Sequence, residues 1–347
     1  MNDLTSMLRA LCEADGVVGC EKNASEQAAQ FLSEWMDDVS IDAFGSVTAV
    51  KKSSKENAKT VLLDAHIDEI GMIVTGIDEK GFLRVSNCGG LDRRLFAAQP
   101  VTVHTKDGDL FGIVGTKPPH LLSDEEAKKV PKIEDLFLDI GYSEDGAKQR
   151  VSLGDRVTVR TPFSVLLGGR VSSKALDDRA GVAAILLALS LLNGEDCGVN
   201  VAVSFTSREE TGGQGATTSA YRLAPDFAVA VDVCHAKTPD STTGKSVPMG
   251  KGAAIAYSPV LDKRCSDALV KMAKEQEIPY QIEAMGDRRT GTNADEIFTT
   301  RGGVRTAVVS IPERYMHTPV EVLDLADIES VAKLLAQFVR EVGNDHV

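Results

Sequence analysis

The chain has 347 residues, of which 43% are hydrophobic and 26% are charged, enough for a substantial core and a second, smaller domain. Acidic residues outnumber basic ones by 51 to 38, and the formal net charge is −13. Because proteins that bind nucleic acid usually present a basic face, this charge argues against a nucleic-acid partner.

The N-terminal segment and the cysteines predict a cytoplasmic protein. Residues 1–16 include Asp3 and contain no apolar stretch of the length that a signal peptide needs. The longest apolar run, around residues 180–192, is shorter than the roughly 20 residues of a membrane span. The six cysteines are scattered without a CxxC pair, as expected of reduced, mostly buried residues. We therefore expect no membrane partner.

Helical periodicity alternates along the chain with short, almost wholly apolar runs. Helices are predicted at residues 4–14, 24–36, 179–192, 265–276 and 325–342. Strands are predicted at residues 60–64, 200–206, 227–231 and 305–311. Such apolar runs are typical of strands buried on both faces, so the sequence predicts an α/β protein with a central, largely parallel sheet flanked by helices.

The middle of the chain has a different pattern. Short alternating segments are separated by turn residues such as Asp107-Gly108, and only residues 123–130 have helical character. This pattern is typical of β-hairpins. We therefore predict that a small β-rich domain at residues 71–164 is inserted into a catalytic α/β domain formed by residues 1–70 and 165–347.

Acidic residues and histidines gather after the predicted strands. The sequence contains no GxSxG elbow, Walker A loop, HExxH or GxGxxG after a strand. The residues that follow strands are His66, Asp68, Glu209, Glu210, Asp232 and His317. Because the carboxyl ends of parallel strands form the ligand crevice of an open sheet, we expect them to converge. Asp177 and Asp178 stand just before a predicted helix and can reach the same edge, and spacing alone does not choose between them.

This set of side chains fits a site for two metal ions. Carboxylates gathered in one pocket raise one another's pKa, and divalent cations remove that penalty. Mixed imidazole and carboxylate ligands suit zinc, cobalt or manganese. Two ions that share one carboxylate need two histidines and three carboxylates, which leaves a net charge of about +1 for a bridging hydroxide. The doublet Glu209-Glu210 allows one side chain to bind metal and the other to carry protons, and Asp68 is placed to orient the His66 ring.

Each residue also has an ordinary structural interpretation. A single histidine after a strand is more often a hydrogen-bonded structural residue, and an aspartate before a helix commonly caps it. Joint placement at successive strand ends is what favours the metal site. Of the remaining histidines, His104 and His346 receive no role, whereas His120 could belong to an interface and His235 could support Asp232.

Five separated motifs make the chain resemble the M42 family of metallo-aminopeptidases over essentially its whole length. They are DAHIDEIG from Asp64, KALDDRAG from Lys174, EETG from Glu209, VDVCH from Val231 and RYMHTPVE from Arg314. The segment KPPHLL is also similar to that family's small β-domain, which takes part in dimer contacts. The resemblance implies a zinc-peptidase-like fold, hydrolysis of N-terminal residues from short peptides, and a homo-oligomer, either a dimer or a dodecamer built from dimers.

The resemblance also implies a role for each motif residue. Two divalent ions, zinc first and cobalt or manganese as alternatives, would bind His66, Asp177, Glu210, Asp232 and His317. Asp177, which stands four residues before Gly181, would bridge the ions. Glu209 would act as general base and then general acid for a metal-bridging hydroxide, and Asp68 would orient His66. Asn293 stands where many relatives carry Asp, and the loop after Glu210 also differs, which bears on specificity.

Two other functions are weighed against this one. Paired carboxylates can cleave glycosides without metal, and some M42-like proteins have been labelled endoglucanases, but 5% aromatic residues with one Trp suit a sugar groove poorly. A metal-stabilised assembly protein without activity is the other alternative, and the intact Glu209 argues against it. Arg288 and Arg289 could select acidic N-terminal residues, although paired arginines are more often a solvated turn.

Overall fold

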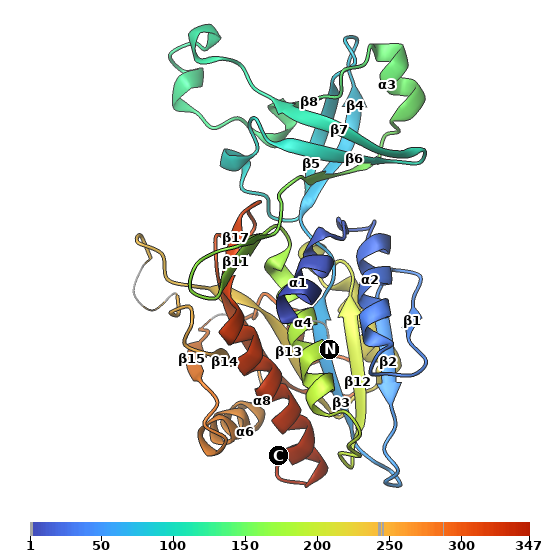
Figure 1. The fold of residues 1–347 in the computed structure, drawn as a ribbon, viewed down its shortest axis with the longest axis vertical. Helices are drawn as coiled ribbons and strands as arrows, with labels where there is room; N and C mark the ends of the chain where they lie inside the picture. The colour runs from blue at the N-terminus through green and yellow to red at the C-terminus, as the bar shows by residue number, and fades with distance from the viewer. Residues whose placement is uncertain (1–2, 242–243, 245, 287) are drawn as a thin grey trace.

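The computed structural model describes residues 3–241, 244, 246–286 and 288–347. A large sheet covered by helices forms the lower body in Figure 1, and a closed barrel stands at one end of that body. Within the described ranges, none of the helices combines the length and the apolar character that crossing a membrane requires.

The large sheet is parallel at its centre and antiparallel towards its edges. Its eleven strands are β1 (Ser40–Ile41), β2 (Val47–Lys51), β3 (Thr60–His66), β10 (Ser164–Val165), β11 (Arg170–Ser173), β12 (Asn200–Thr206), β13 (Phe227–His235), β14 (Ala253–Tyr257), β15 (Tyr280–Ala284), β16 (Arg305–Arg314) and β17 (Glu321–Asp324). Their order is β1-β2-β12-β3-β13-β16-β17-β11-β10, and β14 pairs with β15 and β16. Strands β12, β3, β13 and β16 run parallel, whereas β2 and β17 border them antiparallel. The predicted largely parallel sheet therefore describes only the centre.

The central strands are buried, which explains their almost continuous apolar sequences. In β3, every residue after Thr60 is buried, and in β13 only the last residue is exposed. Both strands run beyond the predicted apolar stretches because their polar ends continue to pair. His66 lies beside Thr206, and Asp232 lies beside Ser310. These two site residues are therefore the carboxyl-terminal part of strands and not the start of loops.

Helices cover both faces of the sheet. One face carries α1 (Leu4–Glu13), α2 (Lys22–Leu32), α4 (Leu176–Leu191), α6 (Lys263–Glu275) and α8 (Leu325–Gly343). The other face carries α5 (Gln214–Leu223) and α7 (Ala294–Ile297), which the sequence did not predict. Helix α4 is apolar on all sides because it is enclosed by the sheet, α1 and α8. The five predicted helices are confirmed within a few residues, and the largest difference is that α2 ends at Leu32 and not at residue 36.

The middle of the chain forms a closed six-stranded barrel. Its strands are β4 (Gly71–Ile77), β5 (Leu83–Cys88), β6 (Pro100–Thr105), β7 (Gly108–Gly115), β8 (Phe137–Asp139) and β9 (Arg156–Val159). They enclose a separate apolar cluster that includes Met72, Phe96 and Leu138. The predicted helical character of residues 123–130 is wrong: this exposed, charged segment has no apolar face and holds only a 3-10 turn. The helix of this region is α3 (Glu144–Arg150). The domain boundaries at residues 71 and 164 stay a prediction.

Candidate metal centre

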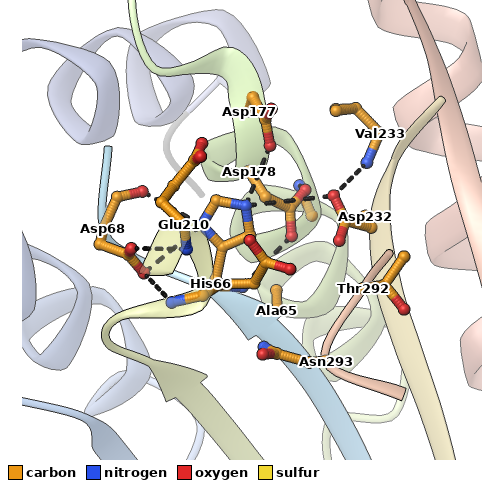
Figure 2. Close-up of polar contacts among 12 residues, drawn as sticks. Ala65, His66, Asp68, Asp177, Asp178, Glu210, Asp232, Val233, Thr292 and Asn293 are labelled. Atoms are coloured by element: carbon orange, nitrogen blue, oxygen red, sulfur yellow. Dashed lines mark hydrogen bonds and ion pairs between the residues drawn. The ribbon is translucent and has the colours of Figure 1, made fainter. Parts of the chain in front are cut away.

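The structure brings the candidate residues together at the carboxyl end of the central strands. His66 ends β3, Asp232 lies on β13, Glu209 and Glu210 form a 3-10 turn after β12, Asp177 lies in the first turn of α4, and His317 follows β16. Figure 2 shows several of these side chains directed towards one another. The convergence expected of a parallel sheet is therefore observed.

Asp177 lies between two imidazole rings. Its Oδ1 is 2.9 Å from Nε2 of His66, and its Oδ2 is 3.4 Å from Nε2 of His317. Burial alone would raise the pKa of Asp177, but hydrogen bonds with the His317 and His66 rings outweigh it and hold the pKa below its ordinary value. A carboxylate that offers one oxygen to each of two imidazoles can bridge two metal ions.

Asp232 extends the His66 side of this arrangement. Its Oδ1 is 4.0 Å from Nε2 of His66 and accepts the backbone N–H of Val233 at 2.8 Å (Figure 2). Burial, reinforced by the neighbouring Asp178, raises the pKa of Asp232 well above its ordinary value. Because a buried carboxylate is expensive to ionise alone, a cation at this place would stabilise its charged form.

Glu210 extends the His317 side. Its Oε1 is 3.4 Å from Nε2 of His317, and burial raises its pKa. Hydrogen bonds with Asp177 and Glu210 in turn raise the pKa of His317 to about 11. Divalent cations displace the protons of their ligands when they bind. The protons that these imidazoles share with carboxylates therefore mark positions that such cations can take. The donor set of two imidazoles and three carboxylates therefore fits two such ions.

The structure separates the roles of the adjacent Asp177 and Asp178, which are joined by a cis peptide bond. The carboxylate of Asp178 is fully buried and accepts the backbone N–H of His66 at 3.3 Å and that of Gly181 at 3.0 Å. It also lies close enough to His66 and Asp232 to share a cation with them. Asp178 thus fastens the end of β3 to α4, whereas only Asp177 contacts both imidazoles.

Asp68 contacts both the His66 ring and the glutamate doublet. Nδ1 of His66 is 3.1 Å from the backbone carbonyl oxygen of Asp68 and 3.6 Å from its Oδ1. The carboxylate oxygens accept the backbone N–H groups of Glu209 at 3.0 Å and Glu210 at 3.1 Å. The sequence predicted only the contact between Asp68 and the His66 ring. The contact with Glu209 and Glu210 depends on where the 3-10 turn meets the end of β3.

Glu209 is half-buried, and the His66 imidazole is near enough to affect its pKa. Burial raises its pKa to about 8, and the negative charges of Glu210 and Asp177 act in the same direction, while His66 opposes them. A carboxyl group with a pKa near neutrality can both accept and release a proton at physiological pH.

Two glycines of the loop that leaves β5 border the site, and the sequence did not single them out. A Cβ at Gly90 would lie 2.6 Å from Nδ1 of His317, and a Cβ at Gly89 would lie 3.1 Å from Oε2 of Glu210. The N–H of Asp92 also reaches the His317 carbonyl oxygen at 3.4 Å. Because glycine has no side chain, this loop of the barrel can approach the candidate ligands closely. The approach is visible only in the three-dimensional structure.

Asn293 lies beneath His66 (Figure 2). Its side chain is buried and donates hydrogen bonds to Oδ2 of Asp64 at 2.8 Å and to Oγ1 of Thr206 at 2.6 Å. Asp64 also accepts a hydrogen bond from Ser204. Asn293 therefore joins the ends of β3 and β12 through its side-chain amide.

A further group of possible ligands lies between the barrel and the body. His104 on β6 contacts Asp109 at 2.9 Å and Asp15 at 3.8 Å. The Lys174 ammonium, however, is 3.1 Å from Asp15 and 2.8 Å from Glu69. Lys174 already supplies Asp15 with a cation, and the contact between His104 and Asp15 joins the barrel to the body.

The other polar residues weighed from the sequence lie away from the site. His120 is exposed on a 3-10 turn of the barrel, His235 is exposed at the end of β13, and His346 contacts Glu341. Arg289 forms ion pairs with two carboxylates, 3.2 Å from Asp295 and 3.0 Å from Glu296. Arg288 is exposed.

Comparisons with known proteins agree with this fold. The sequence model of the M42 glutamyl aminopeptidase family matches residues 45–334. The lysyl aminopeptidase of Pyrococcus furiosus is 34% identical over 97% of this chain and 96% of its own length. The crystal structure of the TET aminopeptidase from a marine-sediment thaumarchaeon is 31% identical, covers 99% of both chains and superposes with a TM-score of 0.92. The TET1 peptidase of Pyrococcus horikoshii, which can assemble into a tetrahedron or an octahedral shell, is 32% identical over 98% of this chain and 100% of its own, with a TM-score of 0.86.

The fold and the matches define a peptidase of the metallo-exopeptidase class. The chain belongs to the M42 family of aminopeptidases.

Proposed function

We propose that this protein is a dimetal aminopeptidase that removes N-terminal residues from short peptides. The observation that carries the proposal is the position of Asp177 between His66 and His317. On this basis we assign the candidate ligands to two sets of three that share Asp177, one completed by His66 and Asp232 and the other by Glu210 and His317.

Two divalent ions would balance this donor set. Three carboxylates against two divalent cations would leave a net charge of about +1, and the ions would lower the pKa of a bound water. Zinc is the proposed metal, with cobalt and manganese as alternatives, since all three accept imidazole and carboxylate together. The ions would supply Lewis acidity, and the ligand residues would fix where the substrate carbonyl meets the water.

Glu209 is the proposed general base and acid. Its backbone is held by Asp68 at 3.0 Å, and its carboxyl group is free to turn towards the water because the neighbouring Glu210 faces His317. The raised pKa of Glu209 suits a group that takes a proton from water and passes it to the departing amine. Asp68 is proposed to orient the imidazole of His66 through its carbonyl oxygen and carboxylate.

The preferred N-terminal residue is open to a direct test. Arg289 is neutralised by Asp295 and Glu296, which weakens the case that it binds an acidic residue of the substrate. Arg288 is exposed and is the remaining arginine candidate. A panel of aminoacyl-p-nitroanilides compared by kcat/KM separates a glutamyl from a lysyl preference, and Arg288→Ala shows whether Arg288 contributes to either.

Residues 71–164 are proposed as an inserted domain that mediates homo-oligomer formation. Large apolar side chains are exposed on this part of the chain, with Phe111 55% exposed, Ile113 46% and Leu121 58%. The family relative TET1 peptidase assembles into large shells. Light scattering coupled to gel filtration distinguishes a dimer from a dodecamer. A cytoplasmic location is proposed on the six cysteines, all of which are free.

The adjacent glutamates give the sharpest test of the chemistry. Glu209→Gln is expected to retain two ions per subunit and to lose about 100- to 10,000-fold in kcat, the usual contribution of a general base. Glu210→Gln, its matched control, is expected to lose metal as well as activity. Metal content and peptide turnover are measured on both. Normal turnover by Glu209→Gln refutes the proposed base, and full turnover by the metal-free protein refutes the dimetal mechanism.

A further inference from the structure

Glu321 is a buried carboxylate that contacts two segments carrying candidate ligands. It is the first residue of β17, stands opposite Ser173 of β11, and is 1% exposed. Strand β11 leads directly into α4, and β17 follows the turn that carries His317. The pairing of β11 with β17 therefore places the Glu321 side chain between the start of α4 and that turn.

Each oxygen of the Glu321 carboxylate serves one of these segments. Oε2 accepts the backbone N–H of Leu176 at 2.7 Å and that of Asp177 at 3.3 Å. Oε1 accepts the backbone N–H of His317 at 3.2 Å. A single carboxylate thus joins the backbones of Asp177 and His317, which are two of the three ligands proposed for the same metal ion.

The turn that carries His317 needs such support. Tyr315 has a φ of 64° and His317 a φ of 61°, so both adopt the left-handed conformation that side chains with a Cβ disfavour. Each such residue costs about 1 kcal/mol or more, and it persists only when the surroundings hold it. The hydrogen bond from the N–H of His317 to Glu321 lies within this strained turn.

We propose that Glu321 is a positioning residue for the second metal ion, the one assigned to Asp177, Glu210 and His317. It contacts neither ion nor substrate; it fixes the separation between the backbones that carry Asp177 and His317. The inference rests on the proposed dimetal function and adds a residue to it. It predicts that replacement of Glu321 weakens the binding of the second ion more than the binding of the first.

Glu321→Gln tests this because glutamine has nearly the same shape but only one acceptor oxygen. If that oxygen still accepts the hydrogen bonds from the N–H groups of Leu176 and Asp177, the amide NH₂ group faces the N–H of His317. Two hydrogen-bond donors then oppose each other. We expect the second ion to bind about 10- to 100-fold more weakly, as when partners that orient metal ligands are removed, with the first ion little changed. Excess metal should restore kcat, which it would not do if the fold alone were damaged.

The matched control is Glu313→Gln. Glu313 is also 1% exposed and stands on β16 opposite Leu323 of β17, yet its two carboxylate oxygens have no hydrogen-bond partner among the described residues. A general effect of neutralising a buried glutamate would appear in both variants. A positioning role predicts the metal defect in Glu321→Gln only.

The readout is metal binding rather than activity alone. The wild type and both variants are titrated with zinc or cobalt, metal content is measured after equilibration, and the cobalt absorption spectrum is recorded. The spectrum of half-loaded Glu321→Gln should match that of His317→Ala and differ from that of His66→Ala. Two ions bound with wild-type affinity, or equal weakening of both ions, overturns the inference.

Two further outcomes remain decisive. If Glu321→Gln does not fold, Glu321→Asp is measured in the same way, because its shorter side chain keeps the charge but cannot span both segments. The affinity for the second ion should again fall more than the affinity for the first. An equal fall for both ions overturns the inference. If the wild type itself binds fewer than two ions, the proposed function fails before the role of Glu321 is reached.

Discussion

Replacing Gly90 by alanine perturbs the candidate metal centre without altering any proposed ligand. The new Cβ would lie 2.6 Å from Nδ1 and 3.0 Å from Cε1 of His317, whereas ordinary contacts begin at 3.4 Å. The imidazole therefore has to retreat by about 0.8 Å, the difference between 3.4 and 2.6 Å. Metal–ligand distances tolerate deviations of only about 0.2 Å. We expect the second ion to bind about 10- to 100-fold more weakly, a loss of about 1.4 to 2.7 kcal/mol.

The assay compares metal content in a zinc buffer with kcat on an aminoacyl-p-nitroanilide. Gly90 is exposed and its φ lies outside the left-handed region, so Gly90→Ala should melt within a few degrees of the wild type. Gly302→Ala is the matched control, since no atom lies within 4 Å of its Cβ position. If Gly90→Ala keeps both ions at wild-type affinity with unchanged kcat, His317 does not bind metal in the geometry described above.

Three other perturbations have defined outcomes. Chelation of metal should abolish peptide hydrolysis and lower the melting temperature, and zinc, cobalt or manganese should restore both; peptide hydrolysis that survives chelation would contradict the dimetal mechanism. Lys174→Met leaves the buried Glu69 without its counter-charge and should lower the free energy of unfolding in urea by about 3–5 kcal/mol, part of which Glu69→Gln should recover in the double variant. Lys263→Met, at an exposed ion pair, should lower it by less than about 1 kcal/mol, and equal losses in the two single variants would contradict the role of burial. Burial raises the pKa of Glu21 to about 7, so Glu21 should cost the wild type stability as the pH rises from about 4.5 through 7. Glu21→Gln can still accept the Gly19 N–H, and its unfolding free energy should fall by less than that of the wild type over that range.

The sequence predicted the site better than it predicted the sheet. The candidate residues could be grouped because histidine and carboxylate residues after apolar runs are visible in a linear pattern, and the parallel centre of the sheet brings those positions together. The edges of the sheet and the helices α5 and α7 were missed because their short or small-residue segments have little periodicity of their own. Strand ends were set too early at β3 and β13, since polar residues that pair with neighbouring strands do not look like strand residues in isolation.

The contacts that the sequence did not predict at Asp68, Asp178 and Glu321 have one property in common: they reach the backbone of another segment. Asp68 holds the N–H groups of the Glu209-Glu210 turn, Asp178 holds the end of β3, and Glu321 holds Asp177 and His317. Such contacts join residues more than a hundred positions apart in several cases, and no local spacing encodes them.

The positioning groups are themselves carboxylates, and this makes the site interdependent. Asp178 and Glu321 each accept backbone N–H groups, which favours the charged form, yet each stands near Asp177, whose charge repels it. Burial raises the pKa of Asp178 and of Glu321 well above the ordinary values, and nearby Asp177 adds to the effect at both. Divalent ions would relieve the repulsion among all of these groups at once, because their charge acts on ligands and positioning residues alike. In the proposed site, metal binding would therefore be coupled to the geometry of the positioning residues, and the acidic side chains gathered there would need cations to stay charged together.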